Sequence, residues 1–377
     1  AKRDDLDNAK LELDKYRGIQ KSAIDDFFFF EKKEEMFNAF NENLQPLFTL
    51  PGAIGSLLNR HFIRAGFVTF FGREKIGKSW LLTDLAMRAL RRYNNVAYFE
   101  MGDSSKSQME RRMGVYLTKS NYDNENIGNQ IRPVMDCQLN QMNTCALPIR
   151  SSKVGIMINE NERMSYEQGE EIGYNPCVAC AHRKKSSYKP ATWVVQHFVE
   201  EINNSKITKA FELWNKHVLK RNRLMVSFNP THTVSYMDVR NKLLYWRDEY
   251  NFHADVVIID YMDIMHMHGK DEREQINKTW AAIRSLSIEF NNLVISASQA
   301  DAASYTKFLI GPENFSGSKT KLAHVTATFG LNKTPEDENR MVMRINAINK
   351  REGKKSKSRY VTVLQNLDQG RAIDESY

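Results

Sequence analysis

Short apolar runs and helical stripes of apolar residues alternate along the middle of this chain. Phe67–Phe71 is an apolar run typical of a buried strand, and Leu81–Leu90 carries apolar residues at helical spacing. Asn94 and Asn95 then turn the chain into Val96–Phe99, a second run typical of a strand. Strand, helix and strand in that order predict a parallel α/β sheet.

The same alternation returns after Trp193. The strands and helices predicted there are Leu224–Phe228, Tyr236–Tyr250, Asp255–Asp260, Glu272–Phe290, Leu293–Ala297, Met341–Ile348 and Tyr360–Leu364. Residues 133–185, between the two parts, show little periodicity and many polar side chains. We therefore predict one α/β core over residues 51–132 and 186–377, interrupted by an insertion over 133–185.

Residues 1–50 form a predicted N-terminal helical segment. Apolar positions recur at helical spacing from Leu6 to Tyr16 and again from Ile24 to Phe40. The run Phe27–Phe30 must be buried, and we favour the local core over a neighbouring subunit as its place.

The composition is that of a soluble globular protein. Of 377 residues, 41% are hydrophobic and 27% are charged, and no apolar stretch approaches the roughly 18 residues of a transmembrane helix. The charged N-terminus does not resemble a secretory signal peptide, so we expect a cytoplasmic protein with no membrane partner. The formal net charge of +8 suits a polyanionic partner, although solubility alone would also explain it.

The segment Gly72–Ser79 fits the phosphate-loop pattern G-x-x-x-x-G-K-[ST] without a mismatch. Gly72 and Gly77 allow the tight backbone turn that points N–H groups at phosphates. In this pattern Lys78 reaches the β- and γ-phosphates, and the Ser79 hydroxyl coordinates Mg²⁺. A predicted strand before the loop and an amphipathic helix after it supply the required context, so we expect a site for ATP and Mg²⁺.

Polar side chains end three of the predicted strands. Asp260 ends the most hydrophobic one, where a carboxylate can hold Mg²⁺ or can instead cap the next segment. Glu100 follows Val96–Phe99, a strand that we expect beside the strand of the phosphate loop. A carboxylate there can act as a general base or simply be solvated. Gln299 follows Leu293–Ala297, and its amide can sense a γ-phosphate.

Taken together, these segments resemble the DnaB-type hexameric replicative helicases, which have a RecA-like motor fold. The matching segments are Gly72–Ser79, Tyr98–Met101 with Arg111 and Arg112, Asp255–Met262, Ile295–Gln299, Phe315–Ala323 and Ile348–Gly353. They follow the family's motif order over residues 66–368. The family's separate N-terminal helical domain has no counterpart in the motifs, and the helical segment 1–50 stands in its place.

The resemblance implies a role for each polar residue at the strand ends. Lys78 would contact phosphate, and Ser79 and Asp260 would hold magnesium. Glu100 would be the catalytic base, and Gln299 would be the sensor of the γ-phosphate.

A basic pair near the C-terminus is implied to complete the site. Arg351 aligns with the arginine that reaches the γ-phosphate of the neighbouring subunit, where a guanidinium neutralises developing charge. The family's lysine of this pair is replaced by Asn349, and Lys350 stands one residue away. An arginine acting in trans requires an oligomer, which the family implies to be a hexameric ring. The alternative for Lys350–Arg359 is a solvated basic turn.

Lys319 and Lys321 fall where the family places a loop that lines its central channel. Lysines there would supply charge for sequence-independent contacts to the backbone of single-stranded DNA. The alternative is that both lysines are only solvated.

The four cysteines of the chain all lie within the predicted insertion. Cys177 and Cys180 have the two-residue spacing of a metal knuckle, whereas Cys137 and Cys145 are more widely spaced. We predict one zinc ion bound by the four thiolates and favour it over two disulfides or an iron–sulfur cluster. The basic run Arg183–Lys185 that follows suits contact with nucleic acid or with another replication protein.

The sequence therefore predicts an ATPase, and by resemblance a ring helicase that moves on single-stranded DNA. Two other readings stay open. One is a RecA-like loader or remodelling ATPase that binds DNA without unwinding it. The other is a binding module in which ATP holds an oligomer together and the cysteine-rich insertion recruits a partner.

Overall fold

The computed structural model describes residues 33–34, 37 and 45–377, apart from positions 103, 160–161, 182–187, 220–221, 267–270, 302–303, 306, 315–320 and 352–359. The chain divides into two compact units, Ala1–Leu44 and Gln45–Tyr377, and the sheet lies in the second. Most of the predicted helical segment 1–50, including Phe27–Phe30, lies outside the described residues, as does Lys319.

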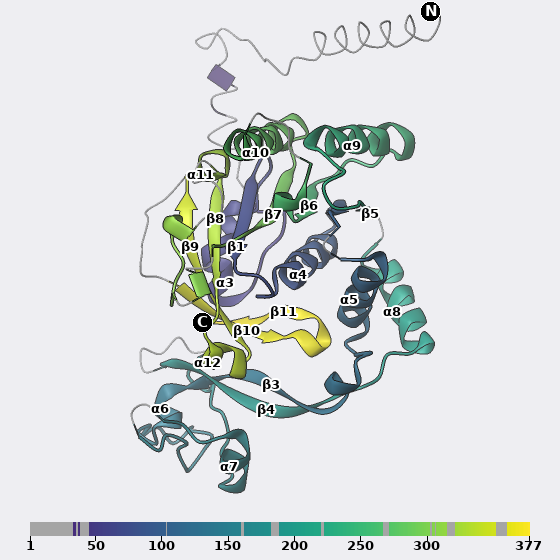
Figure 1. Ribbon diagram of the computed structural model, residues 1–377. Coiled ribbons are helices and arrows are strands. Elements are labelled where there is room, and N and C mark those ends of the chain that lie inside the picture. The colour runs from purple at the N-terminus through teal and green to yellow at the C-terminus, as the bar shows by residue number, and fades with distance from the viewer. Residues whose placement is uncertain are drawn as a thin grey trace, which may run out of the picture. The chain divides into compact units, whose positions relative to one another are not determined.

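A nine-stranded sheet is the frame of the described part of the second unit (Figure 1). Its strands are β1 Phe67–Gly72, β2 Val96–Glu100, β5 Leu224–Phe228, β6 Val256–Asp260, β7 Leu293–Gln299, β8 Ala327–Asn332, β9 Val342–Lys350, β10 Tyr360–Asn366 and β11 Arg371–Ser376. Their order across the sheet is β11-β10-β9-β8-β1-β7-β6-β2-β5. The strands from β8 to β5 are parallel, and β9, β10 and β11 extend the sheet in antiparallel fashion.

Helices connect the strands and cover both faces of the sheet. They are α3 Gly52–Leu58, α4 Lys78–Arg91, α5 Lys106–Thr118, α6 Gln138–Gln141, α7 Tyr166–Glu171, α8 Asn204–His217, α9 Tyr236–Tyr250, α10 Glu272–Glu289, α11 Lys321–His324 and α12 Pro335–Asn339. Short 3₁₀ turns are η2 Asn59–His61, η3 Asn124–Asn126, η4 Met262–Ile264, η6 Pro312–Asn314 and η7 Leu367–Gln369. Several helix starts are fixed locally. Ser105 and Gln108, for example, form a reciprocal capping box at the start of α5.

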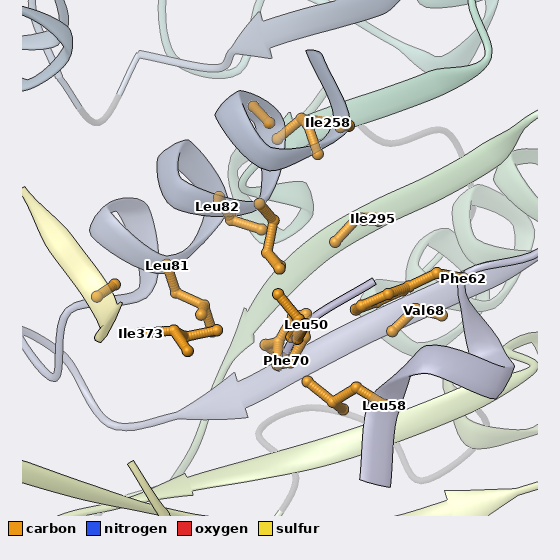
Figure 2. Packing of buried hydrophobic residues seen from close by; sticks show 14 of the residues in the cluster. Leu50, Leu58, Phe62, Val68, Phe70, Leu81, Leu82, Ile258, Ile295 and Ile373 are labelled. Atoms are coloured by element: carbon orange, nitrogen blue, oxygen red, sulfur yellow. The ribbon is translucent and has the colours of Figure 1, made fainter. Parts of the chain in front are cut away.

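One face of the sheet packs against α3 and α4 (Figure 2). Because successive strand residues point to opposite faces, Val68 and Phe70 of β1 lie on this side, together with Ile258 and Ile295. The apolar stripe of α4, which includes Leu81 and Leu82, covers them, and all of these side chains are buried.

The opposite face packs against α9 and α10. Phe67 of β1 and Phe99 of β2 point to this side, and Phe67 lies against Trp280 of α10 with ring centroids 5.5 Å apart. Phe99 stacks on Trp246 of α9 at 5.3 Å. The two cores hold the central strands rigidly, which fixes the positions of the residues at the strand ends.

A two-stranded antiparallel ribbon, β3 Gly128–Cys137 and β4 Pro190–Val199, lies outside the main sheet (Figure 1). The cysteine-rich stretch 138–189 connects its two strands, and Cys137 pairs with Pro190 at the last register position. The ribbon starts at Gly128, before the predicted insertion boundary at residue 133. The domain boundaries themselves stay predictions.

The fold confirms the predicted α/β class and its parallel sheet. Helix α9 spans Tyr236–Tyr250 as predicted, and β6 and β7 lie where their apolar runs placed them. One expectation was wrong: β2 does not lie beside β1, because β7 and β6 stand between them.

Candidate active site

The carboxyl ends of four parallel strands bring the predicted site residues to one edge of the sheet. In the register of adjacent strands, Gly72 of β1 lies beside Gln299 of β7, and Glu100 of β2 lies beside Asp260 of β6. Strand order across this edge is β1-β7-β6-β2, so the phosphate loop and the two acids are neighbours. Open α/β sheets bind ligands at this edge.

The phosphate loop joins β1 to α4 and depends on its glycines. Gly77 precedes α4 with a φ of +100°, a conformation that side chains other than hydrogen rarely tolerate. A Cβ on Gly72 would lie 3.1 Å from Leu331 and Ile76, tighter than ordinary contact. The Lys78 ammonium donates hydrogen bonds to the carbonyls of Gly72 and Arg73 at 3.1 and 2.9 Å, so it lies folded over its own loop.

Asp260 is fully buried and surrounded by hydrogen-bond donors. The Ser79 hydroxyl donates to its Oδ1 at 3.1 Å, and the Tyr98 hydroxyl donates to its Oδ2 at 2.8 Å. The Arg112 guanidinium lies 3.9 Å from the same carboxylate. Burial, followed by the charges of Asp260 and Glu100, raises the pKa of Tyr98 well above its ordinary value. The tyrosine therefore keeps its proton and remains a donor to Asp260.

Glu100 is almost fully buried at the end of β2. Its Oε1 accepts a hydrogen bond from the backbone N–H of Ser104 at 3.1 Å, just before α5 begins. The backbone N–H of Asn229, which follows β5, donates to the carbonyl of Glu100 at 3.0 Å. The carboxylate is thus held at the edge of the sheet beside Asp260, in an environment with little solvent.

Gln299 connects two parts of the site. Its side-chain amide donates to Glu74 of the phosphate loop, and its backbone N–H donates to Asp263 at 2.8 Å. Asp263 lies in η4, directly after Asp260 and Tyr261. A displacement of the phosphate loop can therefore be felt at the end of β7.

Lys321 does not lie where a DNA contact requires it. Its side chain is 3% exposed, and its ammonium donates to Asp263 at 2.8 Å and to Ser298 at 3.0 Å. It also lies over the ring of Trp280, 5.4 Å from the ring centroid. A buried ammonium with an anionic partner is not available to a phosphate backbone, so we withdraw Lys321 as a DNA contact.

Lys350 and Arg351 lie at the opposite edge of the sheet from the phosphate loop. Lys350 pairs in register with Ala327, the first residue of β8, which in turn pairs with Val68 near the start of β1. The Arg351 guanidinium donates to the carbonyls of Val325 and Ala323 at 3.1 and 2.8 Å. Burial, together with the charge of Arg60, lowers the pKa of Lys350. Neither cation reaches the phosphate loop of its own chain.

Three residues of this site were not assigned roles from the sequence. Tyr98 could have been found, because it lies two residues before Glu100 and strand residues two apart share a face. Arg112 lies on α5 and Asp263 follows β6, and their positions depend on how these elements pack. No pattern in the sequence reports that packing.

The four cysteines are reduced, and Cys137, Cys145, Cys177 and Cys180 line one cavity of about 140 Å³. Within the described residues no group of three or more His, Cys, Asp or Glu side chains has the arrangement of a formed metal site. The zinc prediction therefore gains no support from the side-chain positions. In the same part of the chain, no helix has the length and apolar character needed to cross a bilayer.

Two solved structures share this fold. The first is the ATPase domain of a DnaB-like replicative helicase, which superposes with a TM-score of 0.59 at 12% identity, over 93% of this chain and 100% of that one. The second is a DnaB-like replicative helicase solved to study its interactions with primase. It superposes with a TM-score of 0.56 at 12% identity, over 92% of this chain and 66% of that one. No protein-family model and no curated protein sequence matches the chain. The fold is therefore the RecA-like fold of DnaB-like helicase ATPase domains, as the motifs predicted.

Proposed function

We propose that the protein is an ATP-dependent helicase or translocase that works on single-stranded DNA as a ring of identical subunits, a hexamer by resemblance. The observation that carries the proposal is the junction of the phosphate loop and the buried acid. The Ser79 hydroxyl lies 3.1 Å from Asp260 at the carboxyl edge of a RecA-like sheet. A hydroxyl and a carboxylate at this position form the donor set that Mg²⁺ prefers.

The arrangement supports hydrolysis of a nucleoside triphosphate. The N–H groups of the loop and the start of α4 would bind the phosphates, and the Lys78 ammonium would exchange its carbonyl partners for phosphate oxygens. Magnesium, held through Ser79 and Asp260, would neutralise charge on the phosphates. Glu100 would take a proton from the attacking water, and Gln299 would report the state of the γ-phosphate through Glu74.

An oligomer follows from the position of Arg351 if that residue is the arginine finger. It lies at the far edge of the sheet from its own phosphate loop, so it can serve only the site of a neighbouring subunit. Lys350 beside it would supply the second cation of the pair. A head-to-tail contact of this kind closes into a ring.

The DNA contact rests on less. The net charge of +8 favours a polyanion, and Lys319 remains the predicted channel residue. The DnaB-like neighbour was solved to study its interactions with primase, and we include a replication-protein partner in the proposal.

The first test is the steady-state rate of ATP hydrolysis with and without single-stranded DNA. Lys78→Ala serves as the blank, and Lys106→Ala, on the exposed face of α5, is the matched control that should behave like the parent protein. We expect DNA to stimulate the parent and the control several-fold and to leave the blank without activity. Displacement of a labelled strand from a forked duplex is then measured.

The outcomes separate the three readings. Stimulated hydrolysis with ATP-dependent strand displacement supports the helicase. Stimulated hydrolysis without displacement points to the loader or remodelling ATPase. Slow hydrolysis that ignores DNA contradicts the motor and favours the ATP-dependent recruitment module.

A further inference from the structure

The cysteine-rich module, residues 138–189, has a very small core of its own. In the described part of the module and the adjoining ribbon, only Ile156, Tyr174 and Trp193 form a buried apolar cluster. Tyr174 and Trp193 meet edge to face with centroids 5.3 Å apart. A core of this size rarely stabilises a segment of this length, and small modules of this kind usually need a cross-link or a metal.

The backbone brings distant cysteines together through one buried carboxylate. Asp136 is fully buried, and its Oδ1 accepts hydrogen bonds from the backbone N–H of Cys137 at 2.7 Å and of Cys177 at 2.8 Å. Its Oδ2 accepts a hydrogen bond from the hydroxyl of Tyr174 at 2.6 Å. Two cysteines that are 40 positions apart in sequence are thus fixed on either side of the same side chain.

Two tight turns place the other cysteines near this pair. The carbonyl of Leu139 accepts hydrogen bonds from the backbone N–H groups of Thr144 and Cys145 at 3.0 and 3.2 Å, which folds the chain back onto the end of β3. Cys180 follows Cys177 in a turn closed by the bond from the Ala181 N–H to the Val178 carbonyl at 3.0 Å. As a result, all four cysteines of the protein line the same cavity of about 140 Å³.

We propose that Cys137, Cys145, Cys177 and Cys180 bind one structural zinc ion, which cross-links the tip of the β3–β4 ribbon. The ion would draw together four sulfurs that already face one cavity, by rotation of their side chains. Four thiolates around one tetrahedral ion form a closed site with no open position, which suits a structural role and not a catalytic one.

The surroundings of the cavity suit a thiolate site. Leu139, Ala146 and Leu147 contribute apolar walls, and Cys137, Cys177 and Cys180 are each less than 10% exposed. Asp136 does not coordinate in this scheme. It instead holds the backbone of Cys137 and Cys177, as outer-shell groups of metal sites do. The zinc would thereby supply folding energy that the three-residue core lacks.

The proposal is tested on the full chain, purified without chelator and analysed for zinc, iron and acid-labile sulfide. We expect about one zinc per chain and neither iron nor sulfide. Cys177→Ser and Cys180→Ser should lose the zinc. Thr144→Ala is the matched control, because Thr144 lines the same cavity without offering a thiol, and it should keep the zinc.

A second measurement guards against variants that fail to fold. The parent protein is stripped of metal and titrated with Co²⁺, which gives a strong thiolate charge-transfer absorption and the visible bands of a tetrahedral site when cysteines bind it. We expect saturation at one Co²⁺ per chain and displacement by Zn²⁺. Protease cleavage within residues 138–189 should become faster after stripping and slow again after zinc is restored.

Several results would overturn the proposal. A thiol count of two or none in denaturant would mean disulfides, and iron with sulfide would mean a cluster. A parent protein without zinc that gives no thiolate absorption with Co²⁺ would show that the cysteines hold no metal. None of these results would touch the ATPase proposal, whose readout is hydrolysis at the far edge of the main sheet.

Discussion

At the scale of single residues, the two acids of the site differ in what surrounds them. Asp260 is met by a hydroxyl from Ser79, a hydroxyl from Tyr98 and the nearby guanidinium of Arg112, so its negative charge is well compensated. Glu100 receives the backbone N–H of Ser104 on one oxygen. The first environment suits a carboxylate that holds a cation, and the second suits one that exchanges a proton.

Replacing Glu100 by glutamine tests that distinction. Glu100→Gln keeps the size and the hydrogen-bond acceptor but removes the basic oxygen. We expect the rate of ATP hydrolysis to fall by about 10²- to 10⁴-fold, while the Kd for ATP changes less than about threefold. Glu110→Gln, on the exposed face of α5, is the matched control and should retain full activity. A Glu100→Gln enzyme with normal turnover would remove Glu100 from the mechanism.

Lys321 is the residue for which the structure most changes the interpretation. Because its ammonium is buried against Asp263 and Ser298, we expect Lys321→Met to lower the free energy of unfolding by about 2 kcal/mol. Lys278→Met removes a lysine of the exposed i,i+4 pair with Glu274 and should cost less than about 0.5 kcal/mol. Both values come from denaturant unfolding of the full chain.

DNA binding by the same two variants completes the test. If Lys321→Met unfolds like the parent protein but binds single-stranded DNA more weakly and with a smaller salt dependence, its ammonium contacts phosphate. That result would contradict the burial argument and restore the role first predicted from the sequence.

At the scale of elements, the strongly periodic segments were the predictable ones. The apolar run of β6 and the stripe of α4 are buried on both sides of the sheet, so burial left a clear pattern in the sequence. The phosphate loop was readable because its chemistry requires glycines and a lysine at fixed spacing. Asp260, Glu100 and Gln299 followed from their places at strand ends.

Other elements left no such pattern. Strand β8, with its glycine and its polar Thr328 and Asn332, is buried because neighbouring strands surround it and not because its composition is apolar. The ribbon strands β3 and β4 pair over ten positions, yet their side chains are mixed in character. Strand order is equally invisible: β2 follows β1 in sequence, but two later strands are inserted between them. These features depend on long-range pairing.

The turn η2 gives the fold a measurable dependence on pH. Burial, with the charges of Arg60 and Lys350, lowers the pKa of His61 to about 4. Between pH 4 and its ordinary value of 6.5, the unfolded chain therefore binds a proton that the folded chain excludes. Stability should rise with pH across this window, and His61 should contribute about 2 kcal/mol of that rise.

The comparison of two variants isolates the contribution of His61. His61→Gln should flatten the pH dependence of the unfolding free energy between pH 4 and 6.5, relative to the parent protein. His217→Gln, which alters an exposed ring on α8, should keep the slope of the parent. An unchanged slope in His61→Gln would mean that the buried ring does not exclude the proton.

At the scale of the whole molecule, the two edges of the sheet carry complementary chemistry. The phosphate loop and both acids lie at the carboxyl edge, and Arg351 lies at the opposite edge, level with the start of β1. The four residues from Val68 to Gly72 alone separate these edges by about 13 Å along the strand. One molecule therefore offers a site on one side and a cation on the other, which suits a head-to-tail assembly.

Mixing two inactive variants tests this assembly. Lys78→Ala removes the phosphate-binding lysine, and Arg351→Ala removes the cation offered to the neighbour, so each alone should hydrolyse ATP at under about 1% of the parent rate. In rings assembled from equal amounts of both, an intact site meets an intact arginine wherever an Arg351→Ala subunit faces a Lys78→Ala subunit in the productive order. Random assembly gives about one such interface in four, and DNA-stimulated hydrolysis should recover toward that fraction.

The control decides whether the recovery comes from shared sites. Mixing Arg351→Ala with the double variant Lys78→Ala, Arg351→Ala offers no intact arginine to any intact site, so hydrolysis should stay at background. Recovery in the first mixture and not in the second requires that Arg351 acts across a subunit boundary. If Arg351→Ala alone hydrolyses ATP at the parent rate, Arg351 is only part of the surface formed with Val325 and Ala323, and the argument for a ring loses its structural basis.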